Sequence, residues 1–115
     1  VEQLRAAIHE EHIFLDDEAR LRAGTGHGLA DIWRLRTRTV VRLPDAVVRP
    51  ESEEEVQQLL HAAAGNDGFA IIPVGGRTNV TSATICPPLE VEPRPIVSLD
   101  MRALCRLLWV NAEDG

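Results

Sequence analysis

The spacing of apolar residues predicts helices in the first third of the chain. Apolar positions recur among charged residues at helical spacing through residues 2–23, and Gly24 follows as a stop signal. We expect one or two helices there. Residues 28–38 predict another helix, with an apolar set on one face: Leu29, Ile32, Trp33 and Leu35.

The middle of the chain predicts a strand, a helix and a second strand. Residues 46–49 form a short β-branched run that Pro50 closes, and residues 69–74 form a second apolar run. Between them, Ser52 and Glu55 have the spacing of a helix-capping box, and an apolar stripe follows through 64: Val56, Leu59, Leu60 and Ala63. This order predicts a βαβ unit with parallel strands, so the loop after residue 74 should leave the carboxyl edge of the sheet.

Two further strands are predicted after a proline-rich passage, at residues 96–100 and 104–111. The overall prediction is an α/β fold (α+β overall) preceded by helices. The chain starts without methionine and ends on the turn-like sequence NAEDG, and we expect it to be the amino-terminal part of a larger protein.

Composition narrows the class of partner. Aromatic residues make up 3% of the chain, so the core should be aliphatic. All 12 basic residues are arginine, against 18 acidic residues, and the net charge of −6 disfavours a nucleic acid or an anionic membrane. Arginines cluster between residues 20 and 42, which fits a solvated or inter-domain face or a basic face that contacts an anion.

The cysteines and the hydropathy pattern favour a cytoplasmic protein. Cys86 and Cys105 have no histidine or cysteine neighbours at metal-ligand spacing, and the amino terminus does not have the order of a signal peptide. No apolar stretch approaches the ~20 residues of a membrane helix. We therefore expect free thiols, a reducing compartment and no integral membrane segment.

Other motifs carry weak chemical signals. His9 and His12 are spaced i,i+3, whereas a zinc HExxH motif needs i,i+4, and two surface histidines on an acidic helix are the preferred interpretation. Residues 24–29, GTGHGL, do not have the third glycine at the position that a dinucleotide fingerprint requires, and they follow a helix-like segment instead of a strand. They fit a loop leading into a helix. The glutamate run at 53–55 and His61 need only a solvated helix face. We identify no catalytic residue.

The loop PVGGRTNV, residues 73–80, is the strongest candidate site. Proline fixes one backbone angle, and glycines can adopt positive φ and leave room for a ligand, so successive N–H groups can form an anion-binding nest. Arg77 adds a charge, and Thr78 and Asn79 add side-chain donors. From these residues alone, a phosphate cradle and a plain turn both stay open.

The order of three segments resembles the start of the FAD-binding domain in flavoproteins of the vanillyl-alcohol-oxidase type. These segments are LPDAVVRPESEEEVQQLLHAA, AIIPVGGRTNVTSATICP and IVSLDMRALCRLLWVN. Within that family, RAGTGHGLADIWRLR, Cys86-Pro87 and RLLWV are most similar to the synthases that form ether lipids. The resemblance covers roughly residues 20–114.

The resemblance implies FAD as cofactor, held between two subdomains. Residues 1–43 would be an N-terminal helical segment, 44–102 the small FAD-binding subdomain, and 103–115 the truncated first strand of the larger one. The family loop carries the FAD pyrophosphate on backbone amides, which here implies these cofactor-binding residues: Pro73, Val74, Gly75, Gly76, Arg77, Thr78 and Asn79.

The implied reaction exchanges the acyl group of acyl-dihydroxyacetone phosphate for a long-chain alcohol, so the substrate would be a small or lipid-like molecule. In a eukaryote the resemblance implies a peroxisomal location; it leaves the oligomeric state open, with a homodimer possible. A FAD-linked 2-hydroxyacid dehydrogenase or oxidase and a truncated, non-catalytic α/β module are the alternatives.

The loop departs from the family pattern at two positions. Arg77 stands where the family has a third glycine, and Asn79 replaces a serine. A left-handed backbone at Arg77 would cost about 1–2 kcal/mol relative to glycine. Because the other FAD contacts would lie beyond Gly115, this chain alone should bind FAD weakly or not at all.

Overall fold

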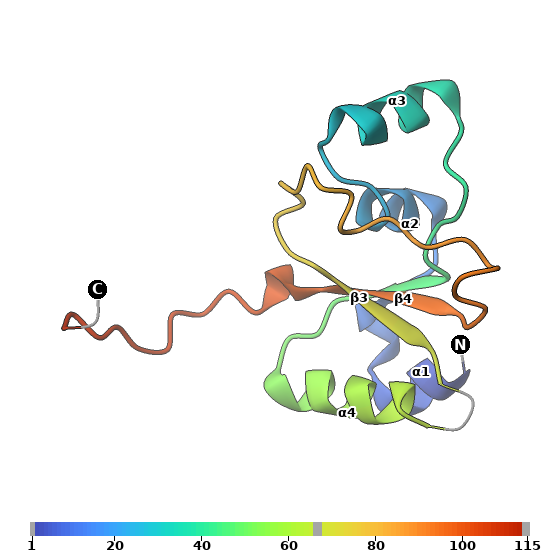
Figure 1. The fold of residues 1–115 in the computed structure, drawn as a ribbon. Helices are drawn as coiled ribbons and strands as arrows, with labels where there is room; N and C mark the ends of the chain where they lie inside the picture. Colours follow the sequence, from blue (N-terminus) through green and yellow to red (C-terminus); the bar gives the residue numbers. More distant parts are fainter. Residues whose placement is uncertain (1, 66–67, 114–115) are drawn as a thin grey trace.

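The computed structural model describes residues 2–65 and 68–113, which fold around one mixed sheet (Figure 1). Its strand order is β1-β2-β4-β3. Strand β1 is antiparallel to β2, and β4 is parallel to both β2 and β3. The predicted α/β class is confirmed. The strands are β1 (Ile13–Phe14), β2 (Ala46–Val48), β3 (Ala70–Val74) and β4 (Ile96–Asp100).

The predicted strand–helix–strand unit consists of β2, α4 (Glu53–Ala63) and β3. Strand β4 lies between the two parallel strands, an order that sequence patterns do not reveal. The Ser52 hydroxyl caps α4 by accepting the backbone N–H of Glu55 at 3.2 Å, as predicted. The Glu55 carboxylate accepts the N–H of Glu51 at 2.7 Å, one residue before the position of a standard capping box.

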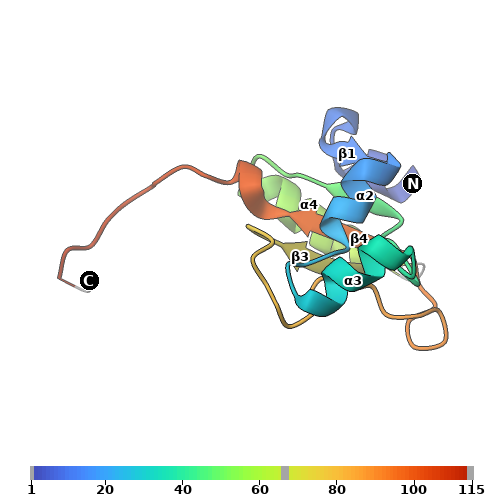
Figure 2. The same cartoon turned by 90° about the horizontal axis from the view of Figure 1, so that it is seen from above.

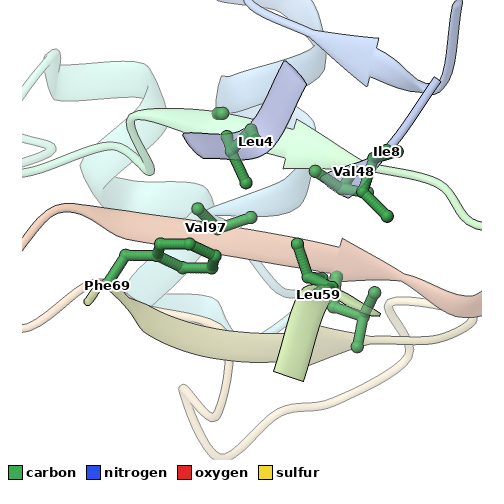
Figure 3. Packing of buried hydrophobic residues seen from close by; sticks show 8 residues of the cluster. Leu4, Ile8, Val48, Leu59, Phe69 and Val97 are labelled. Carbon is green, nitrogen blue, oxygen red and sulfur yellow. The ribbon is translucent and has the colours of Figure 1, made fainter. Parts of the chain in front are cut away.

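Helices cover both faces of the sheet (Figure 1). Helices α1 (Glu2–Ala7) and α4 pack on one face, and α2 (Asp17–Ala23) packs on the other, with α3 (Leu29–Thr37) on the same side as α2. The main core lies under α1 and α4 and is aliphatic apart from one phenylalanine (Figure 3). Its buried members are Leu4, Ile8, Ala46, Val48, Leu59, Phe69, Val97 and Leu99.

The segment between α1 and α2 differs from the prediction of helix alone. It contains a 3-10 turn at Glu10–His12 and the short strand β1. His12, predicted as a surface residue, has a side chain only 14% exposed, and its Nδ1 lies 2.7 Å from Oε1 of Glu55. Glu55 is itself buried, so the prediction of a solvated glutamate run is wrong at this position. Tertiary packing of the N-terminal segment against α4 explains both differences.

The His12–Glu55 pair should make stability depend on pH. The hydrogen bond between His12 and Glu55 raises the pKa of His12 above the usual 6.5. The negative charges of Glu51 and Glu11 raise it further. Burial tends to raise the pKa of Glu55. The hydrogen bonds that its carboxylate forms with the backbone N–H of Glu51 and with the His12 ring have the larger effect, so the pKa of Glu55 is lowered. The pair therefore makes its full contribution to the free energy of unfolding between about pH 4.5 and 6.5. This contribution is lost as the pH rises through the raised pKa of His12.

We predict that His12→Gln lowers the free energy of unfolding by about 1–2 kcal/mol at pH 6 and by less at pH 9, because a charge-assisted hydrogen bond is lost. Urea unfolding at the two pH values measures the difference. His61→Gln, on the exposed side of α4, is the control and should lower the free energy of unfolding much less than His12→Gln does at pH 6. An equal loss for His12→Gln at both pH values would contradict the assignment.

The strand predicted at residues 104–111 is not formed. A 3-10 turn at Met101–Ala103 follows β4, and residues 104–113 then extend away from the body without a helix or strand (Figure 2). A strand needs a hydrogen-bonded neighbour, and no described strand pairs with this segment. Its apolar side chains are exposed: Leu107, Leu108, Trp109 and Val110.

Candidate functional site

The candidate loop begins where β3 ends, at the carboxyl edge of the sheet. Val74 is the last strand residue, and its 1% exposed side chain packs with Val47 and Ala23 under α2. Strand β3 is an edge strand, where a proline such as Pro73 is tolerated because one row of backbone groups has no partner. The buried Val74 and the rigid Pro73 thus fix the direction in which the loop leaves.

Gly75 and Gly76 lie in open space. A Cβ added to Gly75 would meet no atom within 4 Å, and one added to Gly76 would meet only Cγ2 of Thr78, at 3.9 Å. Neither glycine has the left-handed φ that the sequence had allowed for. The folded chain therefore does not itself require glycine at these positions, whereas a ligand lying against the backbone would.

The left-handed residue of the loop is Arg77, with φ of 61°. This is the position where the resemblance to the family implies a third glycine. Thr78 is exposed next to it. The chain therefore keeps the turn of a glycine loop while placing a guanidinium at its tip, a conformation that L residues adopt at a free-energy cost.

We predict that Arg77→Gly raises the free energy of unfolding by about 0.5–1 kcal/mol, since glycine adopts this φ without strain but has more freedom in the unfolded chain. Arg38 has a similar φ of 55° at the end of α3 and gives a matched control, because Arg38→Gly should produce a similar gain. Urea unfolding measures both. A loss of stability in Arg77→Gly alongside a gain in Arg38→Gly would show that the Arg77 side chain stabilises the fold.

Asn79 organises the end of the loop. Its Nδ2 donates to Oγ1 of Thr84 at 3.4 Å, and its Oδ1 accepts the backbone N–H of Ala83 at 3.2 Å. Its backbone carbonyl accepts the N–H of His27 at 3.0 Å. The side chain predicted as a ligand donor is thus engaged within the chain, and its geometry fits a role in positioning the loop.

The GTGHGL segment lies against this loop. As predicted, it leads into a helix, because α3 begins at Leu29. A Cβ on Gly26 would lie 2.7 Å from Oδ1 of Asn79, and one on Gly28 would lie 3.1 Å from the carbonyl oxygen of Val80. These glycines permit a close approach of two backbone segments. The regular spacing of these glycines was the only sequence signal of this close approach. Sequence reasoning did not connect the segment to the candidate loop.

An ion cluster at the same edge was not predicted. Asp100 ends β4 with 2% exposure, and its Oδ2 accepts Nε of Arg49 at 3.0 Å and Nη2 of Arg102 at 2.7 Å. Burial tends to raise the pKa of Asp100, but the hydrogen bonds from Arg102 and Arg49 outweigh it and lower that pKa. The Arg49 guanidinium also lies 4.6 Å from the centre of the Phe14 ring. Asp100 therefore holds two cations beside the loop.

The weaker chemical motifs have structural roles or none. Within residues 2–65 and 68–113, no group of histidine, cysteine and acidic side chains could hold a metal ion. Cys86 and Cys105 are free, as predicted. Burial raises the pKa of the Cys86 thiol to about 11, which disfavours the nucleophilic thiolate form. Arg42, from the predicted basic cluster, donates to the carbonyls of Pro87, Glu92 and Arg94. In the described ranges, no helix is long and apolar enough to cross a membrane.

Comparisons with known proteins identify two kinds of relative. Alkyldihydroxyacetonephosphate synthase of Caenorhabditis elegans is 40% identical over 109 residues, which are 93% of this chain and 18% of that protein. The synthase of Trypanosoma brucei brucei is 34% identical over 115 residues, 100% of this chain and 18% of that protein. The mitochondrial D-lactate dehydrogenase [cytochrome] of Arabidopsis thaliana is 34% identical over 74 residues, which are 64% of this chain and 12% of that protein.

A solved structure of alkyldihydroxyacetonephosphate synthase superposes with a TM-score of 0.86 at 33% identity, over 97% of this chain and 21% of that one. The chain therefore spans about a fifth of the length of the relatives that it matches. Residues 44–115, more than half of the chain, match the FAD binding domain family, and they include β2, β3, β4 and the whole of the glycine loop. This chain belongs to the FAD-binding domain family.

Proposed function

We propose that residues 73–79 hold the pyrophosphate of FAD. The observation that supports this most directly is the open space beside Gly75 and Gly76 at the carboxyl edge of parallel strands. Ligands of open α/β sheets bind at that edge. The chain itself offers no packing reason for either glycine, and membership of a FAD-binding family supplies the ligand.

Backbone amides of residues 75–78 would donate to the phosphate oxygens, and Arg77 would add a positive charge. When bound, FAD supplies the flavin ring, which is the reactive group in flavoenzymes. Val74 anchors the loop in the core, and Asn79 positions its far end. The chain's own contribution is thus to bind and orient the cofactor.

For the intact protein we propose the activity of two relatives that match nearly the whole chain. These are named alkyldihydroxyacetonephosphate synthase and match 93% and 100% of this chain, whereas the D-lactate dehydrogenase matches 64%. The reaction would exchange the acyl group of acyl-dihydroxyacetone phosphate for a long-chain alcohol, with the catalytic side chains supplied by parts of the protein outside these residues. Oxidation of a 2-hydroxy acid is the second candidate, which the D-lactate dehydrogenase match favours.

The proposed substrate class and cellular compartment are consistent with this reaction. The partner is a small or lipid-like substrate rather than a nucleic acid, in keeping with the net charge of −6. The two free cysteines fit a reducing compartment, the cytoplasm or, in a eukaryote, the peroxisome.

The test uses the intact protein, first to identify any bound flavin by its absorbance and by chromatography after release. Two assays then separate the candidates: replacement of the acyl group of acyl-dihydroxyacetone phosphate by a labelled long-chain alcohol, with release of the fatty acid, and reduction of a dye by D-lactate. We expect bound FAD and alcohol incorporation without dye reduction. Dye reduction alone would favour the dehydrogenase, and a protein that never binds flavin would favour a non-catalytic module.

A further inference from the structure

A cavity of about 220 Å³ opens beside the glycine loop on the α2 side of the sheet. It lies at the carboxyl ends of β2, β3 and β4, and Val47 and Val74 line its inner end. Four arginines border it, together with three acidic residues. The arginines are Arg22, Arg49, Arg77 and Arg102.

Three of the four cations have a partner within the chain. Arg22 pairs with Glu18 at 2.6 Å. Arg49 and Arg102 share Asp100, through Nε of the first and through Nε and Nη2 of the second. These bonds leave further N–H groups on both guanidinium groups for another acceptor. The remaining acid, Asp16, is engaged as the cap of α2, where it accepts the N–H of Ala19.

Arg77 differs from the other three. It forms no ion pair or side-chain hydrogen bond with the described residues, and its Nε is buried without a partner. A buried N–H of a cation without an acceptor is unfavourable. The same residue also has the strained φ of 61°. Two unfavourable features at one residue, beside a cavity with spare arginine donors, indicate a site for an acceptor that comes from outside the chain.

We propose that Arg77, Arg49 and Arg102 form a binding site for a phosphoryl group in this cavity, with Arg77 as the direct ligand. Guanidinium groups bind phosphate oxygens through paired N–H donors, and a phosphoryl group would satisfy Nε of Arg77. Asp100 is a positioning residue, since it holds the other two guanidinium groups at the rim. The proposal deepens the proposed function and rests on it, because Val74 and Arg77 of the glycine loop line the cavity.

The phosphoryl group has two chemical sources. It is either part of the pyrophosphate of FAD or a phosphomonoester of a substrate that reaches the same edge of the sheet. Both present tetrahedral, anionic oxygens, so one set of arginines serves either. The experiment therefore includes one probe for each source.

The test is calorimetric titration of the flavin-free intact protein at fixed ionic strength with inorganic pyrophosphate, FAD and glycerol 3-phosphate. Arg77→Gly removes the guanidinium and relieves the strained φ, so it should be more stable and yet bind at least one probe at least tenfold more weakly. Arg77→Lys, which keeps the positive charge, should lose less affinity for the same probe. Arg38→Gly is the matched control, with the same substitution at a similar φ on the exposed end of α3, and should bind all probes like the original protein.

The outcomes separate the sources and the two proposals. Weaker binding of FAD and pyrophosphate would assign the site to the cofactor, and weaker binding of glycerol 3-phosphate alone would assign it to a substrate. Unchanged affinity of Arg77→Gly for all three probes would overturn the site, while loss of FAD from Gly76→Val in the same assay would leave the proposed function standing. If Gly76→Val kept FAD and Arg77→Gly lost pyrophosphate, the proposed function would fail and the arginine site would stand.

Discussion

Gly76→Val in the intact protein should abolish retention of FAD. The valine side chain would occupy the space beside the loop where we place the pyrophosphate, and its Cβ would meet nothing closer than Cγ2 of Thr78 at 3.9 Å. The fold should therefore be unaffected. We expect affinity for FAD to fall at least about 100-fold, about 3 kcal/mol. Flavin absorbance per mole of purified protein measures the loss.

Gly65→Val is the control for this experiment. Gly65 is exposed just beyond α4, before β3 begins, whereas the loop follows the other end of β3. A Cβ on Gly65 meets only the carbonyl oxygen of Ala62, at 3.4 Å. This variant should keep its flavin. A yellow Gly76→Val protein with full flavin content would remove the loop from the cofactor site.

Leu59→Ala should cause a large loss of stability. Leu59 is fully buried on α4 and belongs to the cluster that packs against β2 and β4 (Figure 3). Such truncations destabilise proteins by about 2–5 kcal/mol, a large part of the stability of a small domain. The free energy of unfolding in urea measures the effect.

Leu60→Ala is the matched control, because the same atoms are removed one residue further along the same helix. Leu60 is 51% exposed, so its truncation should change the free energy of unfolding by less than about 1 kcal/mol. Equal losses for the two variants would contradict the packing of α4 on the sheet.

Local patterns predicted the central part of the fold. The apolar run at 96–100 corresponds to β4 without any shift of boundary, and the capping pair Ser52 and Glu55 placed the start of α4. These features depend on residues close together in the chain, where periodicity and capping chemistry act. The helix stripe was less informative, since it grouped the buried Leu59 with the exposed Leu60.

Features that depend on distant contacts could not be predicted in the same way. Strand β1 has two residues and owes its existence to pairing of Ile13 with Val48 and Phe14 with Val47. The burial of His12 and Glu55 results from contact between segments 43 residues apart. Conversely, residues 104–111 have strand propensity but no neighbouring strand within the described chain, so propensity alone did not produce one.

The candidate site likewise has a part that the sequence predicted and a part that it did not. The glycine loop was found from consecutive residues, Pro73 to Asn79, and the structure places it at the predicted edge of the sheet. The bridge from Asp100 to Arg49 was not found, because its residues lie 51 positions apart and only the parallel pairing of β2 with β4 brings them together. The left-handed backbone at Arg77 was anticipated only through the family glycine at that position.

The most direct test of the central claim is a crystal structure of the intact protein with FAD. The account predicts pyrophosphate oxygens within hydrogen-bond distance of backbone N–H groups in residues 75–78, at the end of β3. A pyrophosphate bound elsewhere, with Gly75 and Gly76 facing solvent in the complex, would contradict it.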